Sequence, residues 1–170
     1  MFTYSKESCS QLFGYCDASY ASLSDNIDCK SINGYIFLMQ RSAISWRSTE
    51  QNTVAKSSTE VELQSMSDEA LWLRIIAELD LSTLNPTLIL CDNKSSIEFG
   101  KDARLTHALK HINVKYSSIK ENIEASLIKL KHVSTSDMVA DMLTKPVPPI
   151  KVVDFIINVG LTNYQCTIKK

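Results

Sequence analysis

The order of strand-like and helix-like segments is the feature that most constrains this 170-residue chain. Three strand-like segments come first: one begins at Gln11 and ends in a polar turn over 16–19, and the others span 34–39 and 43–47. An apolar stripe with helical spacing then predicts a long helix over 57–81. Two more strands are predicted at 87–91 and 126–133, and further helices at 93–99, 104–125, 136–143 and 152–159. This order predicts an α/β fold with a mixed sheet and helices on its faces.

Composition narrows the class of protein but says little about partners. Hydrophobic residues make up 44% and charged residues 22% of the sequence, which is ordinary for one globular domain and excludes a disordered chain, a coiled coil and collagen. We expect no membrane partner and no signal peptide, because the chain has neither a long apolar run nor an apolar segment near its start. The formal charge of −1 gives no general indication of nucleic-acid binding. Five cysteines without a CxxC pair favour free thiols in a reducing, intracellular compartment over a zinc site.

Four acidic residues occupy positions from which they could converge at one end of the sheet. Asp17 follows the first predicted strand and Asp92 the fourth, while Glu62 and Asp141 lie in predicted helices. Taken singly, acids at such positions are usually helix caps or turn formers. Taken together, carboxylates at strand ends of one α/β sheet can meet, and their mutual repulsion favours a bound divalent cation. Oxygen ligands suit Mg²⁺, and a pair of such ions can hydrolyse a phosphodiester.

Helix geometry distinguishes Glu62 from its neighbour Glu60. At roughly 100° per residue, Glu62 lies about 60° from the centre of the apolar stripe and Glu60 about 100° from it. Glu62 is therefore predicted to point nearer the sheet, and Glu60 is the alternative if the helix begins irregularly.

Seven segments of the chain, taken together, resemble the ribonuclease H domain of copia-type (pseudoviral) LTR retrotransposon polyproteins. They follow the family's order and cover about residues 11–150: GYCDASYA at 14–21, CKSINGYIFLM at 29–39, AISWRSTEQNTVAKSSTEVEL at 43–63, EALWLR at 69–74, CDNKSSIE at 91–98, LKHINVKY at 109–116 and VADMLTKPV at 139–147. The resemblance implies a five-stranded mixed sheet in the order 3-2-1-4-5. It also divides the chain into an N-terminal extension (1–10), a ribonuclease H-like domain (11–147) and a C-terminal helix and tail (148–170).

The resemblance implies a metal-dependent endonuclease that hydrolyses the RNA strand of RNA–DNA hybrids. The family's four acids fall on Asp17, Glu62, Asp92 and Asp141, which would hold two Mg²⁺ ions, with Mn²⁺ as a possible substitute. The implied partners are the hybrid and the reverse transcriptase domain of the same polyprotein, in a cytoplasmic virus-like particle or in the nucleus. The oligomeric state is not implied.

Some features leave a second interpretation open. Residues 80–90 lack the basic protrusion of cellular ribonucleases H, and His132 belongs to a strand end rather than to the loop that carries their mobile histidine. An alternative is therefore a domesticated or orphaned module that binds or supports but cleaves little alone. Asn93 and Ser95, at the start of a short helix, are either phosphate contacts or plain helix-capping residues.

Overall fold

The computed structural model describes residues 12–19, 30–39, 42–51, 86–101 and 113–161. The strands are β1 (Leu12–Ser19), β2 (Ile32–Met39), β3 (Ser42–Glu50), β4 (Thr87–Cys91) and β5 (Ile128–His132). The helices are α2 (Lys94–Lys101), α3 (Asn113–Glu124), the 3-10 turn η2 (Thr135–Asp137), α4 (Asp141–Thr144) and α5 (Pro149–Asn158). The predicted helix over 57–81, with Glu60 and Glu62, lies outside the described residues. None of the helices in the described ranges is long and apolar enough to cross a membrane.

The five strands form one mixed sheet in the order β3-β2-β1-β4-β5, which confirms the predicted fold and strand order. β1 pairs antiparallel with β2, and β2 pairs antiparallel with β3. β4 lies parallel to β1 on its other side, and β5 continues the parallel half. The first three strands thus form an antiparallel meander, and β1 is the central strand at which the two halves of the sheet meet.

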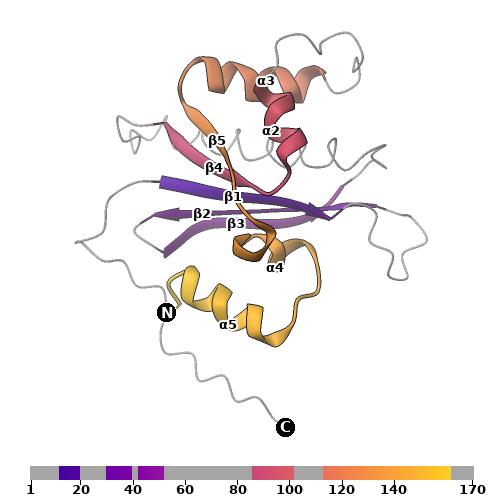
Figure 1. Cartoon of the computed structure of the whole chain (residues 1–170), viewed down its shortest axis with the longest axis vertical. Coiled ribbons are helices and arrows are strands. Elements are labelled where there is room, and N and C mark those ends of the chain that lie inside the picture. The colour runs from indigo at the N-terminus through magenta and orange to yellow at the C-terminus, as the bar shows by residue number, and fades with distance from the viewer. Residues whose placement is uncertain (1–11, 20–29, 40–41, 52–85, 102–112, 162–170) are drawn as a thin grey trace.

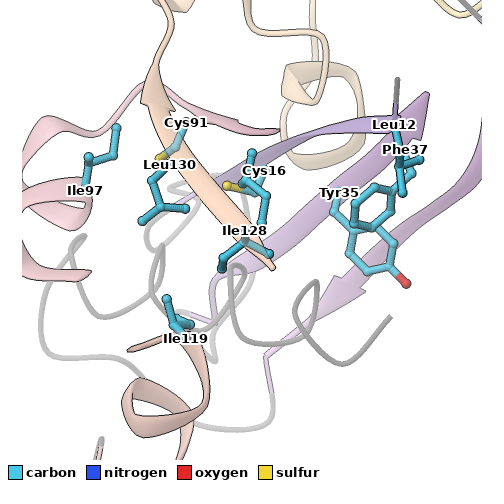
Figure 2. Packing of buried hydrophobic residues seen from close by; sticks show 10 residues of the cluster. Leu12, Cys16, Tyr35, Phe37, Cys91, Ile97, Ile119, Ile128 and Leu130 are labelled. Atoms are coloured by element: carbon cyan, nitrogen blue, oxygen red, sulfur yellow. The ribbon is translucent and has the colours of Figure 1, made fainter. Parts of the chain in front are cut away.

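Described helices cover both faces of the sheet (Figure 1): α2 and α3 lie on one face, and α4 and α5 on the other. Successive side chains of β1 point to opposite faces of the sheet, as they do in any β-strand. Leu12 and Cys16 belong to the core under α2 and α3, together with Phe37, Ile97 and Ile119; Figure 2 shows this packing. Phe13 and Tyr15 pack against the second core, under α4 and α5. Asp17 follows Tyr15 in this alternation and therefore belongs to the α4 face.

Two local predictions were wrong. Asp17 lies within β1 rather than after it, because β1 stays paired with β2 as far as Ser19 and Ile32. The helix predicted over 136–143 is split into η2 and the single turn of α4. The intervening residues, Met138, Val139 and Ala140, are all buried in the second core. Three consecutive side chains cannot share one face of a regular helix, so an irregular link between two short turns buries them instead.

Candidate metal centre

Three of the four predicted acids lie together at one end of the sheet. Asp17, Asp92 and Asp141 each offer a carboxylate oxygen, and these oxygens all lie within 4.8 Å of one another. They come from β1, from the residue after β4, and from the first residue of α4. We call these three residues the carboxylate cluster. Glu62, the fourth predicted acid, and its alternative Glu60 lie outside the described residues.

Parallel pairing brings Asp17 and Asp92 to the same level of the sheet. The β1–β4 ladder pairs Tyr15 with Leu90, and the same register continued by two residues aligns Asp17 of β1 with Asp92, the residue after β4. β4 ends at Cys91 because the chain turns there: the Asn93 backbone N–H points to the Cys91 sulfur, 3.4 Å away. Asn93 Oδ1 then accepts a hydrogen bond of 3.1 Å from the Ser96 N–H and caps α2. Asp92 is held between the end of β4 and this cap.

A glycine on β2 lets α4 bring Asp141 to the sheet. Gly34 pairs with Asp17 across the β1–β2 ladder. A Cβ atom at position 34 would lie 2.6 Å from Thr144 Cγ2 and 2.8 Å from Leu143 Cβ, closer than nonbonded carbon atoms approach. Any larger residue would therefore push α4 outward, and Ser48 Oγ fastens the same turn by donating a 2.6 Å hydrogen bond to the Leu143 carbonyl.

Two of the three carboxylates are almost fully buried, with Asp17 1% and Asp141 3% exposed. Burial raises the pKa of Asp17 above its usual value; the hydrogen bond from Thr144 and the charge of Lys145 oppose this, while Asp141 and Asp92 add to it. Thr144 Oγ1 donates to Asp17 Oδ2. The exposed Thr135 hydroxyl donates to Asp92 Oδ2 over 2.9 Å.

Two lysines supply positive charge to the cluster. Lys145 Nζ lies 2.8 Å from Asp141 Oδ1 and 3.4 Å from Asp17 Oδ2, and Lys151 Nζ lies 3.0 Å from Asp141 Oδ2. Burial pushes the pKa of Lys145 down, but its hydrogen bond to Asp141 and the surrounding carboxylates raise it to a net value above the usual one. Lys145 is therefore charged at neutral pH, and the two ion-paired lysines partly balance the three acids.

The donor set fits a hard divalent cation. All three residues of the cluster offer carboxylate oxygens, which Mg²⁺ and other oxygen-preferring ions select, and neither sulfur nor imidazole belongs to it. Acids placed this close repel one another, and a divalent cation would relieve that repulsion more fully than the two lysines do. The cluster is a candidate divalent-metal site.

The remaining predicted residues lie beside the cluster. Asn93 is the cap of α2, and Ser95 is exposed on the first turn of that helix. His132 is the last residue of β5, as predicted, and its Nε2 lies 3.2 Å from the Asp92 carbonyl oxygen. The imidazole thus contacts the backbone of an acid of the cluster.

Sequence reasoning did not identify Thr144, Lys145, Thr135 or Lys151 as neighbours of the acids. Thr144 and Lys145 follow Asp141 by three and four residues, a spacing that places side chains on one helix face and could have revealed both. Lys151 carries no such local signal, because Pro146, Pro148 and Pro149 separate it from Asp141. Thr135 reaches Asp92 only through the tertiary fold.

Comparison with known proteins relates the sequence to retrotransposon polyproteins. The Arabidopsis thaliana retrovirus-related Pol polyprotein from transposon RE1 is 34% identical over 155 residues, which is 89% of this chain. The corresponding polyprotein from transposon TNT 1-94 of Nicotiana tabacum is 39% identical over 141 residues, or 81% of the chain. The chain belongs to the Pol polyproteins of copia-type retrotransposons. This Pol segment spans about 10% of the length of those relatives, and no protein-family model matches it.

Solved structures identify the fold of the Pol segment. It matches the LC11-RNase H1 structure in complex with an RNA/DNA hybrid at a TM-score of 0.57 and 11% identity, over 79% of this chain and 94% of that one. It also matches the prototype foamy virus protease-reverse transcriptase at a TM-score of 0.57 and 15% identity, over 85% of this chain and 22% of that one. The Pol segment therefore has the ribonuclease H fold.

Proposed function

We propose that this Pol segment is a metal-dependent endonuclease that hydrolyses the RNA strand of RNA–DNA hybrids. One observation carries the proposal: on a ribonuclease H fold, Asp17, Asp92 and Asp141 bring carboxylate oxygens within 4.8 Å of one another at the end of the parallel strands. The site could instead be a structural network of ion pairs. Its three acids outnumber the two lysines paired with them, and two of the acids are buried, which favours a site for phosphodiester chemistry.

We assign the metal ligands to Asp17, Glu62, Asp92 and Asp141, for two Mg²⁺ ions or two Mn²⁺ ions. When bound, the ions would activate the attacking water and stabilise the leaving 3′ oxygen. In this hydrolysis the water oxygen forms a bond to phosphorus and the P–O3′ bond breaks, which leaves a 3′-hydroxyl and a 5′-phosphate. Thr144 and Thr135 hold Asp17 and Asp92 in place, so that the acids need not reorganise when the ions bind.

We assign contacts with the hybrid backbone to Asn93 and Ser95, at the N-terminus of α2. Asn93 uses its oxygen for the cap, which leaves its amide N–H groups as the donors for a phosphate oxygen. The reverse transcriptase domain of the same polyprotein is the proposed partner in cis, in line with the match to a protease-reverse transcriptase chain. We propose an intracellular site of action, in a cytoplasmic virus-like particle or in the nucleus.

Cleavage of a labelled RNA–DNA hybrid tests the proposal directly. The Pol segment should cut the RNA strand with Mg²⁺ or Mn²⁺ and stop on addition of EDTA. Single-stranded RNA, duplex RNA and duplex DNA serve as controls and should remain intact. A second result is that the segment binds the hybrid without cutting it, and that addition of the reverse transcriptase domain does not restore cleavage. That result would support the alternative, a binding or structural module.

A further inference from the structure

Lys151 reaches the carboxylate cluster from a part of the chain that follows the predicted domain. It lies on α5, beyond the three prolines, and its Nζ is 3.0 Å from Asp141 Oδ2 and 3.5 Å from the Thr135 carbonyl oxygen. Figure 1 shows α5 below α4, on the face of the sheet to which Asp17 belongs. The C-terminal helix thus places a charged side chain directly on an acid of the cluster.

Both oxygens of Asp141 are engaged by ammonium groups. Lys145 occupies Oδ1 at 2.8 Å, and Lys151 occupies Oδ2. Each carboxylate oxygen of Asp141 thus has a lysine nitrogen about 3 Å away. A divalent cation that binds either oxygen would be repelled by that nearby positive charge, and such repulsion is strong at short distance. Lys145 is held by two acids, Asp17 and Asp141, whereas Lys151 forms an ion pair with Asp141 alone among the residues that the structure describes. Lys151 is therefore the easier of the two to displace.

The structure offers Lys151 a second position. A cavity of about 360 Å³ lies between η2, α4 and α5, and both Asp141 and Lys151 line it. Two more carboxylates, Asp137 and Asp154, line the same cavity and are exposed. Asp154 follows Lys151 by three residues on α5, a spacing at which helical side chains meet. A lysine that leaves Asp141 thus has two other acids along the same cavity.

We propose that Lys151 is an exchangeable counter-ion of Asp141. It neutralises the carboxylate cluster in the metal-free protein and gives way to a divalent cation, turning toward Asp137 and Asp154. The inference rests on the proposed metal site, and Lys151 is a positioning residue in it, because it acts through Asp141. The C-terminal helix thereby sets how tightly the site holds its metal.

Calorimetric titration of the full chain with Mn²⁺ tests this inference. Lys151→Gln removes the competing charge and should bind Mn²⁺ about three- to tenfold more tightly than the wild type, in line with the strength of a partly exposed ion pair. Lys151→Arg keeps the charge and should bind like the wild type. Lys120→Gln is the matched control, because Lys120 also pairs with an acid, Glu124 at 3.6 Å, but on α3. Lys151→Met provides a second uncharged variant should the glutamine variant fold poorly.

Thermal unfolding supplies a readout that does not depend on catalysis. In EDTA, Lys151→Gln should melt below the wild type, since Lys145 is then the lysine that remains beside the acids. Saturating Mn²⁺ should narrow or remove that difference. If the folded uncharged variants bind Mn²⁺ no more tightly than the wild type, the inference is wrong while the metal site stands. If neither the wild type nor any variant binds Mn²⁺, the metal site of the proposed function fails together with the inference.

Discussion

Gly34 is the cross-strand partner of Asp17, and it is also the residue over which Thr144 and Leu143 pack. The space left by the missing side chain on β2 is filled by the turn that carries Asp141. One position of the sheet therefore sets the distance between two acids of the cluster, although glycine has no group that could bind metal or substrate.

Substitution Gly34→Ala should destabilise the protein and disturb the site together. The new Cβ would overlap Thr144 Cγ2 and Leu143 Cβ, so α4 must shift, at an expected cost of about 1–3 kcal/mol in the free energy of unfolding. Denaturant unfolding and hybrid cleavage measure the two effects. Ser48→Ala is the control, because it removes a hydrogen bond to the same turn without adding volume, and it should cost less than about 1 kcal/mol. Equal, small effects of both substitutions would show that α4 tolerates the extra methyl group.

Asp17→Asn should abolish most hybrid cleavage but preserve hybrid binding. The substitution removes a buried negative charge and a proposed metal ligand with almost no change in volume. We expect turnover to fall at least about 100-fold, equivalent to roughly 2.7 kcal/mol of transition-state stabilisation. Binding should persist because phosphate contacts come mainly from other groups. Cleavage at the wild-type rate would remove Asp17 from the proposed catalytic set.

Glu62→Gln should impair cleavage far more than Glu60→Gln. The helical spacing predicts that Glu62 points nearer the sheet, at about 60° from the centre of the apolar stripe against about 100° for Glu60. Parallel assays of the two variants at equal protein concentration, with Mg²⁺ and with Mn²⁺, compare them directly. The reverse order of activity would assign the fourth ligand to Glu60.

Asp17→Asn should also change how stability depends on pH in the metal-free protein. Burial raises the pKa of Asp17 in the folded protein above its ordinary value of 3.8, so ionisation of Asp17 destabilises the fold. Asparagine removes that penalty: the variant should be more stable than the wild type above the folded pKa. As the pH falls through the folded pKa toward 3.8, the advantage should disappear, because Asp17 is then protonated in both states. Urea unfolding of the wild type and the variant in EDTA, at several pH values, measures the difference in their free energies of unfolding. The neighbouring Asp92, Asp141 and Lys145 are unchanged in both proteins.

Substitutions at Asn93 separate capping of α2 from contact with the hybrid. Asn93→Ala removes the bond to the Ser96 N–H and should lower the free energy of unfolding by about 1 kcal/mol. Asn93→Ser keeps a capping oxygen but lacks the amide donors, so it should be nearly as stable as the wild type and yet bind the hybrid more weakly. Ser95→Ala tests the neighbouring contact. Wild-type binding by the serine variant would leave Asn93 as a helix cap alone.

The sheet was predictable because its signals are local. Alternating and β-branched segments marked the strands, and the order of strands and helices predicted a mixed sheet. The 3-2-1-4-5 arrangement was implied by the resemblance to the ribonuclease H domain of copia-type polyproteins, and the structure confirms it. The end of β1 was placed too early, since the polar residues 17–19 resemble a turn until β2 is known to pair with them. The break between η2 and α4 was missed because it depends on burial of three consecutive residues, which helical periodicity does not encode.

The neighbours of the acids were less predictable than the acids themselves. Carboxylates at strand ends carry a chemical signal that can be recognised in the sequence. The contacts of Gly34 and Lys151 depend on which segments the fold brings together, and nothing near either residue in the chain indicates its partner. The electrostatic balance of the cluster therefore required the structure.

The hydrogen bond from Thr144 to Asp17 joins residues 127 positions apart. During synthesis Asp17 leaves the ribosome long before Thr144, by roughly 6–25 s at about 5–20 residues per second. A nascent chain, or one cut before α4, has β1 and its acid but cannot assemble the cluster. The order of synthesis therefore fixes that the proposed metal site forms only after α4 has been made, however early β1 pairs with β2.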